Sequence, residues 1–130
     1  AMALGAEVKI RSYANRYLAF QPNYILANAF KRNIESLGME TEEPTSVGGA
    51  TDMGNVSRVS PSIHPSIQIM PKGTPGHSYE TAKASISERG HEAAIIGAKS
   101  LALTALDIFT GEVAVEEMKK EFREAKNETK

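Results

Sequence analysis

The chain contains no cysteine and no tryptophan, and its 15 basic and 16 acidic residues leave a formal net charge of −1. Without cysteine the chain can form neither a disulfide framework nor a thiolate zinc finger, and this agrees with a reducing compartment. We therefore expect a cytoplasmic protein. The near-neutral charge gives no reason to expect nucleic acid or an anionic membrane as a partner.

Long uninterrupted apolar runs are also lacking. A helical membrane span needs about 20 consecutive apolar residues, whereas the most apolar window, Ala93 to Phe109, contains Lys99 and Asp107. The sequence therefore predicts no membrane partner. With 130 residues, of which 41% are hydrophobic and 24% charged, the composition is typical of one soluble globular domain.

The first third of the chain predicts a strand followed by a helix. Ala6, Val8 and Ile10 alternate with charged residues, which is the period of a half-buried strand. Asn23 then stands where a helix cap belongs. The helix itself is indicated by apolar residues three and four positions apart and by a glycine at the end, namely Leu26, Phe30, Ile34, Leu37 and Gly38.

The rest of the chain predicts a second short strand and two more helices. The strand is expected at 66–70, a long apolar helix at 90–109, and an amphipathic helix from Gly111. One helical turn is expected around 52–56. The predicted fold class is therefore α+β, with short strands and three main helices.

The least regular third of the sequence is "GGATDMGNVSRVSPSIHPSIQIMPKGTPGHSYETA", which holds His64 and His77. Imidazole is a common metal ligand, and the Pro-Gly turn before His77 can aim its side chain outward. A histidine in such a loop is nevertheless usually structural or solvated. The turn from Gly48 to Asp52 could offer backbone N–H groups to a carboxylate, although many turns look alike. Residue chemistry alone stops at an α+β domain with a histidine-bearing loop.

Three segments taken in order carry a resemblance to a known family. They are "GGATDMGNVSRVSPSIHP", "GTPGHSYETA" and "GHEAAIIGAKSLALTALDIF". Together they resemble the C-terminal part of the dinuclear zinc amidohydrolases and peptidases, which include carboxypeptidase G-type enzymes, aminoacylases and hippurate hydrolases. The match is closest to the aminobenzoyl-glutamate hydrolase branch, where a Thr-Asp-x-Gly-x-Val-Ser loop and a Gly-His-Ser/Thr element recur. The resemblance covers roughly residues 6–109.

The resemblance implies a domain division and a role for each loop residue. Residues 1–20 would end the lid domain, 21–126 would form the C-terminal part of an α/β zinc-peptidase catalytic domain, and 127–130 would be a frayed tail. His77 would be the last protein ligand of a site for two zinc or manganese ions. The predicted substrate-binding residues near the substrate's carboxylate end, or in the pocket, are Gly48, Gly49, Thr51, Asp52, Asn55 and His64.

The family's remaining machinery has no counterpart in this sequence. Its His-x-Asp motif, bridging aspartate and Glu-Glu pair lie upstream, and Glu42-Glu43 lies after the first predicted helix, so it is not that pair. One histidine cannot activate water between two metals. The resemblance therefore implies no catalytic residue in this chain. It implies a C-terminal fragment of an enzyme that hydrolyses an amide bond of an N-acyl or N-aroyl amino acid or a dipeptide-like substrate. The fragment alone would be inactive without its missing N-terminal part.

Two other interpretations stay open. The chain could be a non-catalytic binding or structural module derived from that family. It could also be a small metal-binding protein that uses His64, His77 and His91, with at most one weak site, because a lone histidine gives no closed coordination sphere. For the fragment interpretation, the lid strand has lost its neighbours and the long helix part of the sheet on which it would pack. Unpaired strand edges and exposed apolar faces favour association, so we expect a homo-oligomer, formed by strand pairing or swapping.

Overall fold

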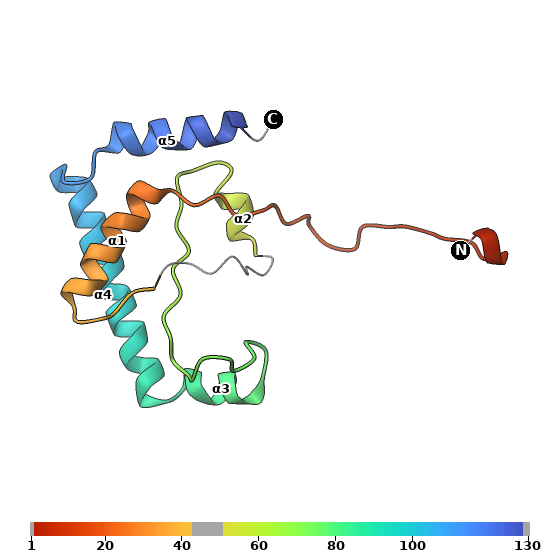
Figure 1. Cartoon of the computed structure of the whole chain (residues 1–130), viewed down its shortest axis with the longest axis horizontal. Helices are drawn as coiled ribbons and strands as arrows, with labels where there is room; N and C mark the ends of the chain where they lie inside the picture. Colours follow the sequence, from red (N-terminus) through yellow and green to blue (C-terminus); the bar gives the residue numbers. More distant parts are fainter. Residues whose placement is uncertain (1, 43–50, 129–130) are drawn as a thin grey trace.

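The computed structural model describes residues 2–42 and 51–128, and its regular structure in this part of the chain is helical throughout (Figure 1). The long α4 runs beside α1, α3 and α5 lie at its two ends, and an extended N-terminal segment points away from the helices. The elements are a short 3-10 helix, η1 (Met2–Leu4), and the α-helices α1 (Tyr24–Ser36), α2 (Met53–Val56), α3 (Tyr79–Ser85), α4 (Glu88–Thr110) and α5 (Val115–Glu128).

The core lies where α1 packs along α4. The stripe predicted from the sequence is confirmed in its first three positions, because Leu26, Phe30 and Ile34 are buried. Ala29 joins them. On α4 the buried positions are small. Gly90 lies against the backbone at the end of α3, and the others are Ala93, Ser100 and Thr104. Small side chains let the two helices approach closely, so the larger residues of α1 fill the space between them.

A polar bridge links the same two helices beside the apolar contact. The side-chain amide of Asn33 on α1 donates to Thr104 Oγ1 at 3.1 Å and to Asp107 Oδ2 at 2.7 Å on α4. A hydrogen bond to a carboxylate is stronger than one between neutral groups. The bridge therefore fixes the position of α1 along α4, which apolar packing alone specifies less tightly.

The start of α1 is capped from both directions along the chain. Asn23, only 2% exposed, accepts a hydrogen bond from the Leu26 amide through its side chain. The side-chain nitrogen Nδ2 of Asn23 also donates to the Met118 carbonyl on α5 at 3.1 Å. From α5, the Glu121 carboxylate accepts from the backbone N–H groups of Tyr24 and Ile25, at 2.7 and 3.1 Å. A carboxylate is favourable here because the first N–H groups of a helix lack partners within it.

The last two helices are separated by a glycine whose role differs from the prediction. Gly111 was expected to open the final helix, but it ends α4 with a left-handed φ of 84°. Only glycine adopts this conformation without steric cost. The chain then turns before α5 begins at Val115. The apolar stripe predicted for α5 is half-buried at Val115, Met118, Phe122 and Ala125.

The α+β prediction is wrong, because the described residues contain no strand. Residues 6–11 are extended and exposed, yet no neighbouring segment pairs with their backbone, and a sheet requires such a neighbour. Residues 66–70 are also extended, but their apolar side chains contact a helix and not a second strand. The Ile67 side chain lies so close to α4 that a Cβ on Gly97 would meet its Cδ1 at 3.0 Å.

One side of α4 carries exposed apolar residues along its length. We call this side the outer face of α4. Its exposed residues are Ala94, Ile95, Ala98, Leu101, Ala102, Ala105, Leu106 and Phe109. By length and composition alone, α4 is apolar enough to cross a membrane, and 17% of its most apolar window is buried. One such helix is a weak indication, since core helices of soluble proteins meet the same criterion.

Replacing Glu121 with alanine should destabilise the protein by about 1 kcal/mol, the usual effect of losing a helix cap. Urea unfolding followed by circular dichroism measures this change. Glu124→Ala is the matched control, because it removes the same charge from α5 but only a surface pair with Lys120, at 3.9 Å. Equal stability of the two variants would contradict the capping role of Glu121.

Candidate functional site

The three histidines lie in three different settings and do not form a cluster. His77 is exposed in the turn that leads into α3, and His91 is exposed in the first turn of α4. His64 is exposed in the extended segment before α3, with its ring edge-on to Phe20 at a centroid distance of 6.3 Å. No group of three or more His, Asp or Glu side chains in the described ranges, 2–42 and 51–128, is arranged to hold a metal ion.

His77 is presented by the helix that follows it. The Ser78 hydroxyl caps α3 by accepting from the Thr81 amide at 3.2 Å, which fixes where the helix starts. The Thr81 hydroxyl donates back to the Pro75 carbonyl at 2.7 Å, so the turn is closed across its base. These bonds hold the backbone of 75–81 while the imidazole faces solvent. A side chain so placed can act as one ligand to a metal whose other ligands come from elsewhere.

The predicted carboxylate-binding turn is described only in part. Gly48 and Gly49 lie outside the described residues. Thr51 donates to Asp52 Oδ1 at 3.2 Å and accepts from the Met53 amide at 3.4 Å. Asp52 stands at the N-cap of α2, but its side chain makes no capping bond. The two side chains therefore bond each other and the start of α2.

Asn55 is tied to the backbone of a distant segment. Its Oδ1 accepts from the Leu18 amide at 3.0 Å, and its Nδ2 donates to the Arg16 carbonyl at 3.0 Å. This pair of bonds is the one that a neighbouring strand would offer. The structure thus shows that Asn55 positions the backbone at Arg16 and Leu18. The sequence predicts only a place in the substrate pocket. The contact of Asn55 with a substrate, and that of His64, stay predictions.

Next to Asn55, sequence reasoning missed Gly54, Ser57 and Arg58. All three contact the segment just before α1, which Asn55 also holds. The signal in the sequence is the run Gly54 to Arg58, which combines one glycine with three polar side chains in a single helical turn. Such a turn has little apolar surface to bury, so its side chains serve to bond backbone elsewhere.

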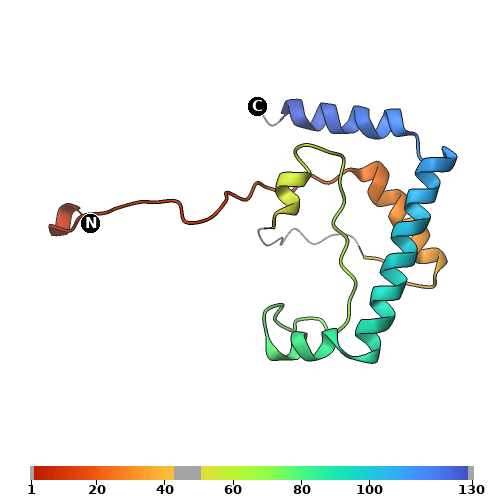
Figure 2. The same ribbon diagram turned by 180° about the vertical axis from the view of Figure 1, so that it is seen from behind.

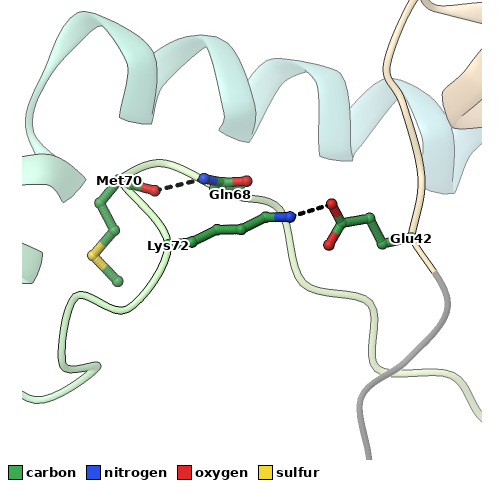
Figure 3. A network of polar contacts seen from close by, with 4 residues as sticks. All are labelled: Glu42, Gln68, Met70 and Lys72. Carbon is green, nitrogen blue, oxygen red and sulfur yellow. Dashed lines mark hydrogen bonds and ion pairs between the residues drawn. The ribbon is translucent and has the colours of Figure 1, made fainter.

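The acidic connector after α1 is occupied by a surface ion pair (Figure 3). Glu42 pairs with Lys72, and their side chains are 70% and 68% exposed. Nearby, the side-chain amide of Gln68 donates to the Met70 carbonyl at 2.9 Å. Exposed pairs of this kind contribute about 0–1 kcal/mol. Glu42 is thus a solvated side chain here, and Glu43 lies outside the described residues.

Comparison with known proteins adds what the geometry leaves open. No protein-family model matches the chain. It is 37% identical over 129 residues to the mouse (Mus musculus) Xaa-Arg dipeptidase and 34% identical over 127 residues to the human (Homo sapiens) one. The chain is similar to dipeptidases. These relatives support a peptidase and amidohydrolase relationship, and they do not single out the aminobenzoyl-glutamate hydrolase branch.

The alignments cover most of this chain but only a small part of each relative. Each alignment covers 95% of this chain but only 29% of the relative. The chain therefore spans less than a third of the length of the curated relatives it matches. The matched part accounts for nearly all of the described helices. It leaves most of each dipeptidase without a counterpart here.

Zinc should bind the isolated chain weakly, with at most one site and no rise in thermal stability at stoichiometric metal. A single imidazole cannot close a tetrahedral coordination sphere. Titration calorimetry of the wild type and of the His77→Ala and His64→Ala variants measures the affinity. A tight, stoichiometric site lost in both variants would contradict this and would favour an independent metal-binding protein.

Proposed function

We propose that the chain is the C-terminal part of a metal-dependent peptidase or amidohydrolase that cleaves an amide bond of a dipeptide-like or N-acyl amino acid substrate. The observation that carries the proposal is the similarity over 95% of the chain to two Xaa-Arg dipeptidases. Their names favour the dipeptide-like class over N-aroyl amino acids. The three sequence segments that resemble dinuclear zinc amidohydrolases lie within the same stretch.

In this proposal His77 supplies one ligand to the metal site. Its exposure in a turn closed by Ser78 and Thr81 leaves the imidazole accessible. The described residues fit one ligand and not a complete sphere, so the other ligands must come from another part of the parent protein. A metal bound there would polarise the scissile carbonyl and lower the pKa of a bound water.

The Thr51–Asp52 turn is the proposed place of the substrate's carboxylate end. The Thr51 hydroxyl can donate to a carboxylate oxygen if it leaves Asp52 Oδ1, with which it bonds at 3.2 Å. Asp52 repels a carboxylate directly, so its role is to orient the turn. The resemblance implies a carboxylate-binding role for Gly48 and Gly49 as well, which lie outside the described residues.

An alternative is a non-catalytic binding or structural module derived from the same family. One observation favours it: in the described residues, no group of three or more His, Asp or Glu side chains is arranged to hold a metal ion. Both proposals agree that the chain alone has no hydrolytic activity. They differ in whether His77 contributes to the activity of a longer protein.

We also propose that the isolated chain self-associates through the outer face of α4. Four large apolar side chains there are more than half exposed, namely Ile95, Leu101, Leu106 and Phe109. Lys99 is the single charged residue among the exposed positions between Ala94 and Leu106. An apolar surface of this length is uncommon on a monomer and is usually covered by another polypeptide.

A chimera separates the enzyme from the module. The matched segment of the mouse Xaa-Arg dipeptidase is replaced by this chain, and dipeptide hydrolysis is measured with and without a chelator. We expect metal-dependent activity that falls by at least about 100-fold on His77→Ala, since even indirect metal contacts carry 10–100-fold effects. His91→Ala is the control and should keep activity. Full activity in His77→Ala would contradict the ligand role.

The isolated 130-residue chain should hydrolyse neither dipeptides nor N-acyl amino acids, with or without zinc or manganese. One metal ligand provides no activated water and no general base. A chromatographic assay of the released amino acid checks this. Metal-dependent turnover by the chain alone would refute the proposal that the catalytic groups lie elsewhere.

Light scattering at rising concentration should show a mass above that of a monomer. The pair of substitutions Leu101→Gln and Leu106→Gln should lower the oligomeric fraction, because it places polar groups on the outer face of α4. Val59→Gln is the matched control, since Val59 is 77% exposed and lies outside α4. A clean monomer at high concentration would rule out self-association.

A further inference from the structure

The extended N-terminal segment is hydrogen-bonded to one turn of the described chain. We call residues 6–15 the arm and residues 16–21 the exit segment. Residues 3–19 are exposed, and the arm runs away from the helices in both views (Figures 1 and 2). The hydrogen bonds that hold the exit segment come from Asn55, Ser57 and Arg58.

These three side chains form hydrogen bonds with the exit segment at residues 16, 18, 19 and 21. Asn55 takes the Leu18 amide and the Arg16 carbonyl. The Arg58 guanidinium donates through Nε to the Ala19 carbonyl at 3.1 Å and through Nη1 to Gln21 Oε1 at 2.8 Å. The fully buried Ser57 hydroxyl accepts from the Gln21 amide at 2.9 Å. These bonds hold six residues that have no strand partner in the part of the chain that the structure describes.

Steric fit at Gly54 makes the contact specific. A Cβ at Gly54 would lie 1.8 Å from the Leu18 carbonyl oxygen and 2.9 Å from its carbon. Gly54 is buried, and its neighbour here is backbone, which cannot rotate away as a side chain can. The exit segment therefore lies directly on α2, at a distance that only glycine allows.

The same turn is anchored to the helical unit from its other side. Within the turn, the Ser57 hydroxyl donates to the Gly54 carbonyl at 2.8 Å, which holds the turn itself together. Downstream, the Ser62 carbonyl accepts a hydrogen bond from the backbone N–H of Asn23 at 2.9 Å, immediately before α1. The turn at 53–58 thus sits between the exit segment and the start of α1. It can fix the angle at which the arm leaves the helices.

We propose that α2 with Ser57 and Arg58 is a clamp that sets the direction of the arm, with Asn55 as its main positioning residue. The clamp replaces the sheet partner that an extended segment normally needs. The arm is thereby held in a defined orientation relative to α1 and α4. The inference concerns the chain itself and does not depend on the proposed enzymatic function.

Trypsin provides the test, because the arm carries cleavage sites outside the clamp, after Lys9 and Arg11, and the exit segment carries one inside it, after Arg16. In the wild type, cleavage after Arg11 should be faster than cleavage after Arg16, whose carbonyl is held by Asn55. Asn55→Ala removes two hydrogen bonds and should accelerate cleavage after Arg16 about 25-fold, roughly fivefold for each bond lost from the local opening equilibrium. The rate after Arg11 should not change. Mass spectrometry of the fragments gives both rates.

Three further variants sharpen the result. Gly54→Ala should accelerate cleavage after Arg16 at least as much as Asn55→Ala, whereas Gly76→Ala should not, because a Cβ at Gly76 meets no atom within 4 Å. Asn28→Ala, at an exposed position of α1, is the control for Asn55→Ala. If Gly54→Ala does not fold, Asn55→Ala decides alone.

Amide hydrogen exchange gives an independent measurement of the same clamp. The amides of Leu18 and Gln21 should be protected in the wild type, and Leu18 should lose its protection in Asn55→Ala. Gln21 bonds Ser57 and should lose less. Unchanged exchange at Leu18, together with unchanged cleavage after Arg16, would overturn the proposal.

Discussion

The buried amide of Asn23 is the interaction on which the arrangement of helices depends. Its side chain caps α1 and donates to the Met118 carbonyl on α5, while its backbone N–H donates to the Ser62 carbonyl. A buried polar group without partners is costly, so each of these three segments must stay in place. The residue thereby joins the N-terminal helix, the loop after α2 and the C-terminal helix at one point.

The same logic extends to the parts of the chain that lack regular structure. The exit segment has no strand beside it, and side chains of the turn at 53–58 supply the bonds that a sheet would give. The loop that carries Thr51 and Asp52 is continuous with that turn. A stretch that composition marks as irregular is therefore where long-range hydrogen bonds concentrate. The proposed carboxylate-binding residues lie on one positioned turn, and His77, the proposed metal ligand, lies on another.

Local patterns predicted α1, α4 and α5 because the causes of these helices are local, whereas α3 was not predicted. The cap at Asn23, the stripe at Leu26, Phe30 and Ile34, and the long apolar run of α4 all act within a few residues. The strands were mispredicted for the opposite reason. Alternation at 6–11 shows which residues suit a sheet face, but it cannot supply the neighbouring strand. The positioning roles of Gly54 and Asn55 were also missed, because their partners lie more than 30 residues away.

The sequence by itself determined the helix-forming segments, the exposed histidine turn and the resemblance to amidohydrolases, since each depends on residue type and short spacing. The tertiary structure alone decided how those segments meet. It assigned Glu121 to cap a helix 97 residues earlier and turned Asn55 towards the backbone at Arg16 and Leu18. It also left the outer face of α4 exposed. Contacts between distant residues follow from the packing of whole helices, and no local pattern encodes that packing.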